Sequence, residues 1–221
     1  MNLYLSSYMI GDHADRLLSM AGGPGARMAV ITNALDAFTF DDQLTYARTQ
    51  FDADEYFAAH GFDPSLVDLR RYAGRREALR RVLLRHRVIW VLGGNTFLLR
   101  RAMRESGFDE VIREVLDDGV IYAGWSAGAC VAGDSLQAVG IMDEPGITAP
   151  GYLTSDVIWK GLGLVPFTIL PHYESDHLEA PLAAKAATWA VEQQIDFRTL
   201  RDGEVMLVAN GGAPTLLPRA A

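Results

Sequence analysis

One stretch constrains the fold more than any other: a short apolar run that ends in a Gly-x-Ser-x-Gly turn. Residues 120–123 are apolar and predict a buried strand, and the chain continues as Gly124-Trp125-Ser126-Ala127-Gly128 into small residues that suit a helix. A sharp strand-to-helix turn of this kind holds a serine in a strained conformation with its hydroxyl projecting from the sheet. The pattern predicts a nucleophile elbow.

The glycines of this turn have a steric reason. Gly124 and Gly128 are small enough to let the strand and the helix approach each other closely. The backbone N–H of Ala127 then lies at a helix N-terminus, where an unpaired donor stabilises a developing oxyanion. The alternative interpretation of Ser126 is a capping residue in an ordinary tight turn.

The remaining chain predicts an α/β fold. Short apolar runs alternate with helical patterns, which favours a mostly parallel sheet covered on both faces. The expected strands are 3–6, 28–32, 67–69, 88–92, 120–123, 139–142 and 167–171, with a terminal hairpin of 204–208 and 215–217. The expected helices are 12–20, 41–59, 74–86, 97–105, 108–117 and 181–194. The whole chain, 1–221, is expected to form a single domain.

Composition excludes several classes of partner. The net charge of −8 and the pI near 5.1 provide no basic field for nucleic acid or an anionic membrane. The arginines of residues 70–87 fall mainly on the polar faces of a predicted helix. Cys130 is the only cysteine, so neither an internal disulfide nor a thiolate metal cluster is expected. With no signal-peptide pattern and no long apolar run, we expect a cytoplasmic protein.

A second motif follows the clearest predicted strand. Residues 88–92 end at Gly93-Gly94-Asn95-Thr96, at the edge of the sheet where active sites of α/β proteins gather. Glycine lets the chain turn and lets substrate approach, so the backbone here is a candidate for the second half of an oxyanion hole. A phosphate-binding loop and a plain turn are the alternatives.

A serine nucleophile needs a base and an orienting carboxylate. His172 follows the predicted strand 167–171 and is the preferred base, ahead of His177 in a polar segment. The acidic candidates between Ser126 and His172 are Asp134, Asp143, Glu144 and Asp156. Asp143 and Glu144, in the turn after 139–142, are preferred over the other two, and only one of these adjacent side chains can face the histidine.

Three motifs together resemble the peptidase E (aspartyl dipeptidase) and cyanophycinase family of serine hydrolases. They are Gly93-Gly94-Asn95-Thr96-Phe97, Gly124 to Ala129, and Pro171-His172-Tyr173, in that order. The resemblance implies a three-layer sandwich related to class I glutamine amidotransferases (flavodoxin-like). It also implies Ser126 as nucleophile, His172 as base, and the backbone of Gly94 and Ala127 as oxyanion hole. The acidic member falls in the region of Asp143 and Glu144, with Asp143 preferred.

The expected activity is hydrolysis of a peptide bond in a small peptide, as in a dipeptidase, with no metal or organic cofactor. An esterase-like serine hydrolase and a catalytically silent binding domain are the alternatives. Asn95, Trp125 and Tyr173 adjoin the expected site and are candidate substrate contacts. Residues 140–163 are a candidate lid. The Ala-rich helix 181–194 is expected to pack either on the sheet or on a second subunit, which would make a homodimer.

Side-chain specificity stays open at this stage. Peptidase E binds an N-terminal aspartate through a positively charged group in the region after the histidine. Here residues 172–197 contain only Lys185 and His177 as cations. The resemblance therefore implies the hydrolytic groups without implying the Asp-X substrate.

Overall fold

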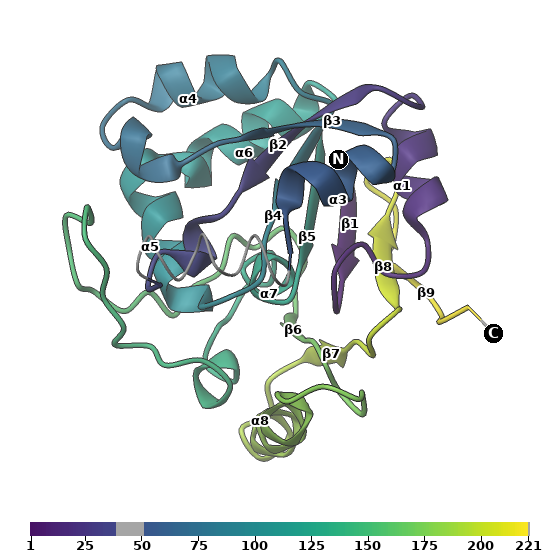
Figure 1. Ribbon diagram of the computed structural model, residues 1–221. Helices are drawn as coiled ribbons and strands as arrows, with labels where there is room; N and C mark the ends of the chain where they lie inside the picture. Colours follow the sequence, from purple (N-terminus) through teal and green to yellow (C-terminus); the bar gives the residue numbers. More distant parts are fainter. Residues whose placement is uncertain (39–50, 221) are drawn as a thin grey trace.

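A twisted, mostly parallel sheet forms the centre of the molecule (Figure 1). The computed structural model describes residues 1–38 and 51–220, and the sheet within them has seven strands in the order β3-β2-β4-β5-β1-β8-β9. The strands from β3 to β1 run parallel, and β8 and β9 add an antiparallel hairpin at one edge. Their bounds are β1 Asn2–Ser6, β2 Ala26–Ile31, β3 Phe62–Leu66, β4 Val88–Val91, β5 Ile121–Trp125, β8 Val205–Val208 and β9 Thr215–Leu217.

Helices cover both faces of this sheet, which confirms the predicted α/β class (Figure 1). One face carries α1 Ala14–Met20 and α3 Ala53–Ala59. The other carries α4 Arg76–Leu83, α5 Thr96–Ser106, α6 Phe108–Asp117 and the short α7 Ala127–Cys130. The expected helices of the N-terminal two thirds thus lie where the apolar periodicity places them, apart from residues 41–50, which lie outside the described residues.

The strands between the two helical layers are apolar on both sides. Along β4, Ile89 and Val91 pack in one core cluster, whereas Val88 and Trp90 pack in the other. Because side chains alternate across a strand, a strand buried on both faces has a continuous apolar sequence. This pattern explains why β4 was the clearest strand in the sequence.

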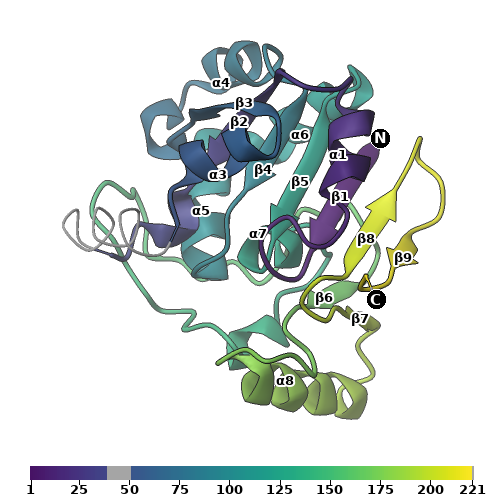
Figure 2. The same ribbon diagram turned by 45° about the vertical axis from the view of Figure 1, so that its right-hand side comes forward.

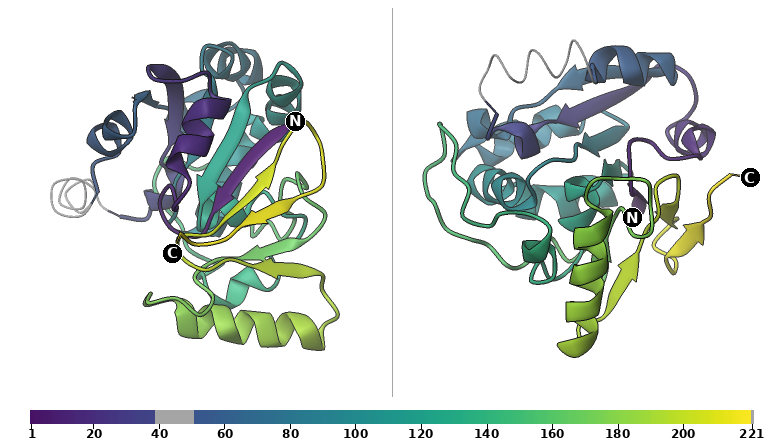
Figure 3. Two further views of the ribbon diagram at one scale, coloured as in Figure 1. Left: turned by 90° about the vertical axis from the view of Figure 1, so that its right-hand side faces the viewer. Right: turned by 60° about the horizontal axis from the view of Figure 1, so that its bottom comes forward.

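A smaller layer lies at the carboxyl end of the parallel strands (Figures 2 and 3). Two short parallel strands, β6 Thr168–Leu170 and β7 Phe197–Thr199, pair with each other and are joined by α8 Ala180–Glu192. Alanines of α8 pack on β6 and on the turn of 139–141. The strand expected at 167–171 therefore exists, but it belongs to this second sheet.

Two expected strands are wrong. Residues 67–69 lead into a 3₁₀ turn, η2 Leu69–Tyr72, which begins at the last of them, and the strand of this region is β3, which contains Pro64. Proline argued against a strand, yet β3 is an edge strand, where one missing donor is tolerated. Residues 139–141 form the 3₁₀ turn η3, because a short apolar run fits either a strand or one helical turn and this one packs against α8.

The terminal hairpin is confirmed, since β8 pairs with β1 on one side and with β9 on the other. No helix within residues 1–38 and 51–220 has the length and apolar character needed to cross a membrane. The fold places the turns after β1, β4 and β5 side by side, and the β6–β7 layer faces them at the same end of the sheet (Figure 3). The candidate site is built from these turns.

Candidate active site

The predicted elbow is present after β5. Ser126 has φ 46° and ψ −115°, a left-handed conformation that is strained for any residue with a side chain. A Cβ atom on Gly124 would lie 2.9 Å from the carbonyl carbon of Gly128, and one on Gly128 would lie 2.2 Å from the carbonyl oxygen of Val91. Both glycines are therefore required by the crossing of the strand and the helix, as the sequence predicted.

The turn after β4 lies against the elbow. An added Cβ on Gly93 would come within 3.1 Å of Ser126 Cβ, and Gly94 has φ +129°, which only glycine adopts readily. Within the described residues, the backbone N–H groups of Gly94 and Ala127 have no hydrogen-bond acceptor. Two unpaired donors beside a serine hydroxyl are what an oxyanion hole requires.

His172 lies after β6, on the side of the cleft that the smaller layer provides. Its side chain is 1% exposed and its φ is 60°, so the base, like the serine, has a strained backbone. The ring Nδ1 lies 2.8 Å from Asp202 Oδ1. Burial works against the charge of Asp202, but the hydrogen bonds from His172 and Ser7 hold the pKa of this carboxyl below its usual value. An ionised Asp202 accepts a hydrogen bond from Nδ1–H, which leaves Nε2 as the unprotonated, basic nitrogen.

A serine from the first strand ties this pair together. The Ser7 hydroxyl, which follows β1, accepts a hydrogen bond from the His172 backbone N–H at 2.7 Å and donates one to Asp202 Oδ1 at 2.7 Å. On the other side, the backbone N–H of Asp202 donates to Ser175 Oγ at 2.8 Å. Residues from three distant parts of the chain thus fix the orientation of one imidazole ring.

Neither expected acidic partner, Asp143 or Glu144, forms a hydrogen bond with His172 within the described residues. Asp143 Oδ2 accepts a hydrogen bond from the backbone N–H of Thr96 at 2.8 Å, so this carboxylate caps the N-terminus of α5. Burial raises the pKa of Asp143 to about 6, although the hydrogen bonds from Thr96 lower it. The Glu144 carboxylate accepts from the N–H of Gly146 in an exposed turn. Asp202 instead holds the position next to His172 Nδ1.

Asp202 was missed because the acid was sought between the serine and the histidine. It follows β7, in a polar turn between the buried Leu200 and Gly203. The only feature of the sequence around Asp202 is this polar turn, and such turns are common on protein surfaces. Only the pairing of β6 with β7 brings residues 172 and 202 together.

The three expected substrate contacts lie in different places. Trp125 is 5% exposed and lines the cleft. Asn95 has a structural contact instead: its side chain caps α5 through the N–H of Leu98 and donates to the carbonyl of Glu144. Tyr173 packs against the core cluster around α8. Neither Asn95 nor Tyr173 is among the described residues that line the cleft.

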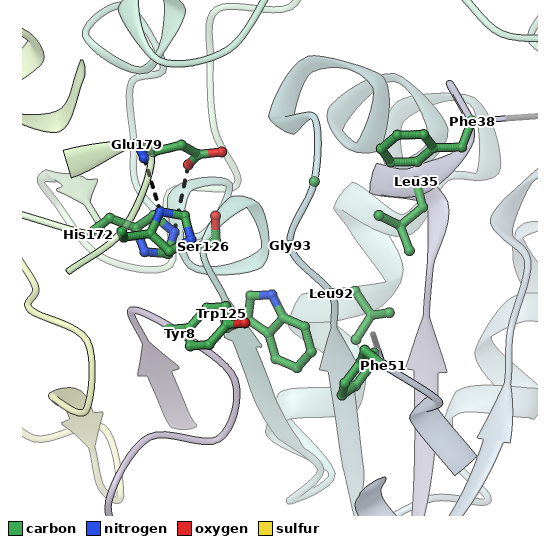
Figure 4. Close-up of a pocket in the computed structure, with 12 residues that line it drawn as sticks. Tyr8, Leu35, Phe38, Phe51, Leu92, Gly93, Trp125, Ser126, His172 and Glu179 are labelled. Atoms are coloured by element: carbon green, nitrogen blue, oxygen red, sulfur yellow. Dashed lines mark hydrogen bonds and ion pairs between the residues drawn. The ribbon is translucent and has the colours of Figure 1, made fainter. Parts of the chain in front are cut away.

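Two further polar side chains stand beside His172. The ring of His177 stacks on that of His172 with centroids 3.8 Å apart and planes 9° apart, and burial lowers the pKa of His177. Glu179 Oε2 lies 3.7 Å from His172 Nε2 (Figure 4). Ligand atoms of His172, His177 and Glu179 lie within 4.8 Å of one another, which is the spacing of a metal site. A metal bound there would occupy a nitrogen of His172.

These groups surround a small cavity of about 190 Å³ (Figure 4). Ser126, His172 and Glu179 lie on one side of it, and apolar side chains lie on the other. The described lining residues are Tyr8, Leu35, Phe38, Phe51, Leu92, Gly93, Gly94, Trp125, Ser126, His172, His177 and Glu179. The arrangement offers a strained hydroxyl, a base with an ionised partner and two unpaired N–H donors, which is the equipment for acyl transfer.

Comparison with known proteins points to one family. The model of "Peptidase family S51" matches residues 13–216, nearly the whole chain. Peptidase E of Actinobacillus pleuropneumoniae serotype 3 is 31% identical over 141 residues, which are 62% of this chain and 55% of that protein. Peptidase E of Haemophilus influenzae is 37% identical over 92 residues, 42% of this chain and 38% of that protein. The chain thus matches less than two thirds of the length of these relatives.

Solved structures agree on the fold. A crystal structure described as a "putative peptidase E protein" from Listeria monocytogenes EGD-e superposes with a TM-score of 0.75 at 22% identity, covering 99% of this chain and 98% of that one. A peptidase from an acI-B1 Actinobacterium gives a TM-score of 0.65 at 14% identity, over 100% and 95% of the two chains. At these identities the likeness concerns the fold, which is the amidotransferase-like sandwich expected from the sequence.

Proposed function

The chain belongs to peptidase family S51, and from that premise we propose that it is a serine peptidase that cleaves a peptide bond in a small peptide. The proposed catalytic residues are Ser126, His172 and Asp202. The observation that carries the assignment is the 2.8 Å contact between His172 Nδ1 and Asp202, because it leaves Nε2, which lies 3.7 Å from Glu179 Oε2, as the ring nitrogen that can accept a proton from Ser126. This order of serine, base and acid completes a triad.

The first half of the proposed reaction forms an acyl-enzyme. His172 Nε2 accepts the proton of the Ser126 hydroxyl as its oxygen attacks the carbonyl carbon of the scissile amide. The carbonyl oxygen becomes an oxyanion, which accepts hydrogen bonds from the N–H groups of Gly94 and Ala127. As the C–N bond breaks, His172 donates the proton to the leaving amine, and the acyl group stays on Ser126.

Water completes the cycle by the same steps. His172 accepts a proton from the water that attacks the acyl carbon, and the second oxyanion occupies the same pair of N–H groups. Collapse breaks the ester bond, and the proton on His172 returns to Ser126. Throughout, Asp202 stabilises the imidazolium form of His172 and holds its orientation, and Ser7 holds Asp202.

The small size of the cavity, about 190 Å³, supports a short substrate rather than a folded protein. The same serine and histidine could also hydrolyse an ester, so amide hydrolysis has to be measured directly.

The test is hydrolysis of a dipeptide panel by the wild type and by Ser126→Ala, with product amines quantified. We expect Ser126→Ala to lower kcat by a factor on the order of 10⁶. The matched control is Ser19→Ala, an exposed serine on α1, which should leave kcat unchanged. Equal turnover by wild type and Ser126→Ala, with both proteins folded by circular dichroism, would contradict the proposal.

A further inference from the structure

The wall of the cleft opposite His172 is apolar. It is made by side chains from η1 Asn33–Leu35, from the turn after β4, from the elbow and from the segment before α3 (Figure 4). Phe51, Leu92 and Trp125 are 6%, 2% and 5% exposed, and Phe38 at the rim is 49% exposed. The aromatic rings of Phe51 and Trp125 meet edge to face with centroids 4.9 Å apart. This wall is pre-formed and gives the cleft an apolar surface for a bound ligand.

The described lining of the cleft has a negative charge. Among the described lining residues there is no lysine or arginine, and Glu179 is the one carboxylate. In the smaller layer Arg201 is paired with Glu174, and Arg70 near η1 is paired with Asp36 and Asp68. His177 contributes little positive charge, since burial lowers its pKa. The cleft therefore favours a cation near Glu179.

A negatively charged substrate side chain has no place in this arrangement. Against the apolar wall it would lose its hydration without gaining a cationic partner among the described lining residues. An apolar side chain gains there, because the surface it buries is removed from water. The same wall that accepts leucine or phenylalanine thus rejects aspartate.

We propose that the substrate is a peptide whose amino-terminal residue has a large apolar side chain, which lies against Phe38, Phe51, Leu92 and Trp125, while Glu179 binds the α-ammonium group of that residue. This assignment rests on the proposed function, because it places the carbonyl of that same residue at Ser126. In an amino-terminal residue one carbon separates the ammonium group from the carbonyl. A carboxylate that binds this group must lie beside the catalytic pair, and Glu179 lies 3.7 Å from His172 Nε2.

A competing role for Glu179 is to stabilise the imidazolium form of His172 without touching the substrate. That role would lower turnover equally for peptides with free and with acetylated amino termini. Binding of the ammonium group would instead make the loss depend on the free amine. The two roles therefore differ in a measurable ratio.

The experiment compares kcat/KM for Leu-Leu, Phe-Leu, Asp-Leu and N-acetyl-Leu-Leu. We expect Leu-Leu and Phe-Leu to be cleaved at least about 100-fold faster than Asp-Leu, since an unpaired buried carboxylate is strongly disfavoured. Acetylation of Leu-Leu should lower kcat/KM by at least about tenfold, as expected for loss of a charge-assisted contact. In Glu179→Gln the ratio of free to acetylated peptide should fall toward one, chiefly through KM.

A charge introduced at the rim tests the apolar wall. Phe38→Arg, at a half-exposed position, should lower the ratio of Leu-Leu to Asp-Leu cleavage by at least about tenfold, because the guanidinium supplies the missing partner for aspartate. The matched control is Leu153→Arg, the same change of charge at a residue that is 73% exposed and outside the cleft. It should leave the ratio unchanged.

Failure of this inference is distinguishable from failure of the proposed function. Ser126 should react with a small fluorophosphonate whatever the peptide preference, because that reaction needs only the catalytic groups. If Ser126 is labelled but Asp-Leu is cleaved as fast as Leu-Leu, or acetylation has no effect, the substrate assignment is overturned and the peptidase proposal stands. If Ser126 is not labelled on folded protein, the peptidase proposal itself fails.

Discussion

The two sides of the cleft are specified in different ways. On one side, Ser126 and the Gly93-Gly94 turn follow directly from adjacent strands of the main sheet, and their glycines are required because these two turns pack closely on each other and on Ala34. On the other side, His172 is held by Asp202, 30 residues away, and by Ser7, 165 residues away. The nucleophile side is local, whereas the base side is assembled from distant segments.

This difference teaches where sequence motifs are informative. A local device needs small residues at fixed spacings, because strands and helices must approach closely, and that requirement is visible as Gly-x-Ser-x-Gly. A device assembled by tertiary packing needs only a carboxylate and a hydroxyl in the right places. Asp202 and Ser7 stand in unremarkable polar turns, so no spacing rule identifies them.

The largest expected effect distinguishes the two acidic residues. Asp202→Asn removes the charge that orients and stabilises His172, and we expect kcat to fall by about 10⁴. Asp143→Asn keeps a side chain able to cap α5 and is the matched control, with kcat within about tenfold of wild type. Steady-state kinetics on one dipeptide decides between them. A greater loss in Asp143→Asn than in Asp202→Asn would return the acidic role to the turn after η3.

The glycine turn gives the next effect. A Cβ on Gly94 would lie 2.6 Å from the carbonyl oxygen of Ala34 and the residue has φ +129°, so Gly94→Ala must displace the backbone N–H. We expect kcat to fall by about 10² to 10³, as for loss of one oxyanion donor. Gly22→Ala is the control, because it has φ +98° with nothing within 4 Å of the added Cβ.

The Gly22 variant should lose about 1 kcal/mol of stability and no activity, since only backbone strain is introduced. Thermal melts and kcat measured on both variants separate strain from catalysis. Full activity in Gly94→Ala would show that the Gly94 N–H is not part of the oxyanion hole. The nucleophile side of the cleft would then not be specified by this turn.

The fold was largely predictable for the same reason. Buried strands such as β4 and β5 have continuous apolar sequences, and the helices between them have clear apolar periodicity. Tertiary context decided the exceptions. Pro64 is tolerated because β3 lies at the sheet edge, and the apolar run at 139–141 forms a 3₁₀ turn because it packs on α8. In the site, Ser126, His172 and the Gly94 turn line one cleft, whereas Asp143 and Glu144 form hydrogen bonds elsewhere.

Ser7 tests the assembled side with a smaller expected effect. Ser7→Ala removes a donor to Asp202 and an acceptor for the His172 N–H, so we expect about a tenfold loss in kcat and about 1–3 kcal/mol of lost stability from the unpaired buried groups. Ser7→Thr, which keeps the hydroxyl, should recover part of the activity. If Ser7→Ala has wild-type kcat, Asp202 is positioned without it.

The pH dependence of stability gives the smallest effect and separates the same two acids by sign. The pKa of Asp202 is lowered by folding, so its contribution is present above its unfolded pKa and is lost as pH falls through the folded value. The pKa of Asp143 is raised to about 6, so its contribution is present below the unfolded pKa and is lost as pH rises through about 6.

Urea unfolding of wild type, Asp202→Asn and Asp143→Asn measures these contributions at pH values between 3 and 7, about half a pH unit apart. This range includes the ordinary carboxyl pKa near 4. Relative to wild type, the free energy of unfolding of Asp143→Asn should rise by about 2 kcal/mol as pH rises from 4 to 7. The free energy of unfolding of Asp202→Asn should fall relative to wild type as pH rises through the acidic part of the range. Parallel pH profiles for both variants would contradict the assigned environments.

The central claim is that Ser126 is a nucleophile activated by His172 and Asp202. The most direct measurement is reaction of the folded protein with a fluorophosphonate, followed by intact mass and peptide mapping of wild type, Ser126→Ala and Asp202→Asn. The account predicts one adduct at Ser126 in the wild type, none in Ser126→Ala, and much slower labelling in Asp202→Asn. An adduct on another residue, no adduct on folded wild type, or labelling of Asp202→Asn at the wild-type rate would contradict it.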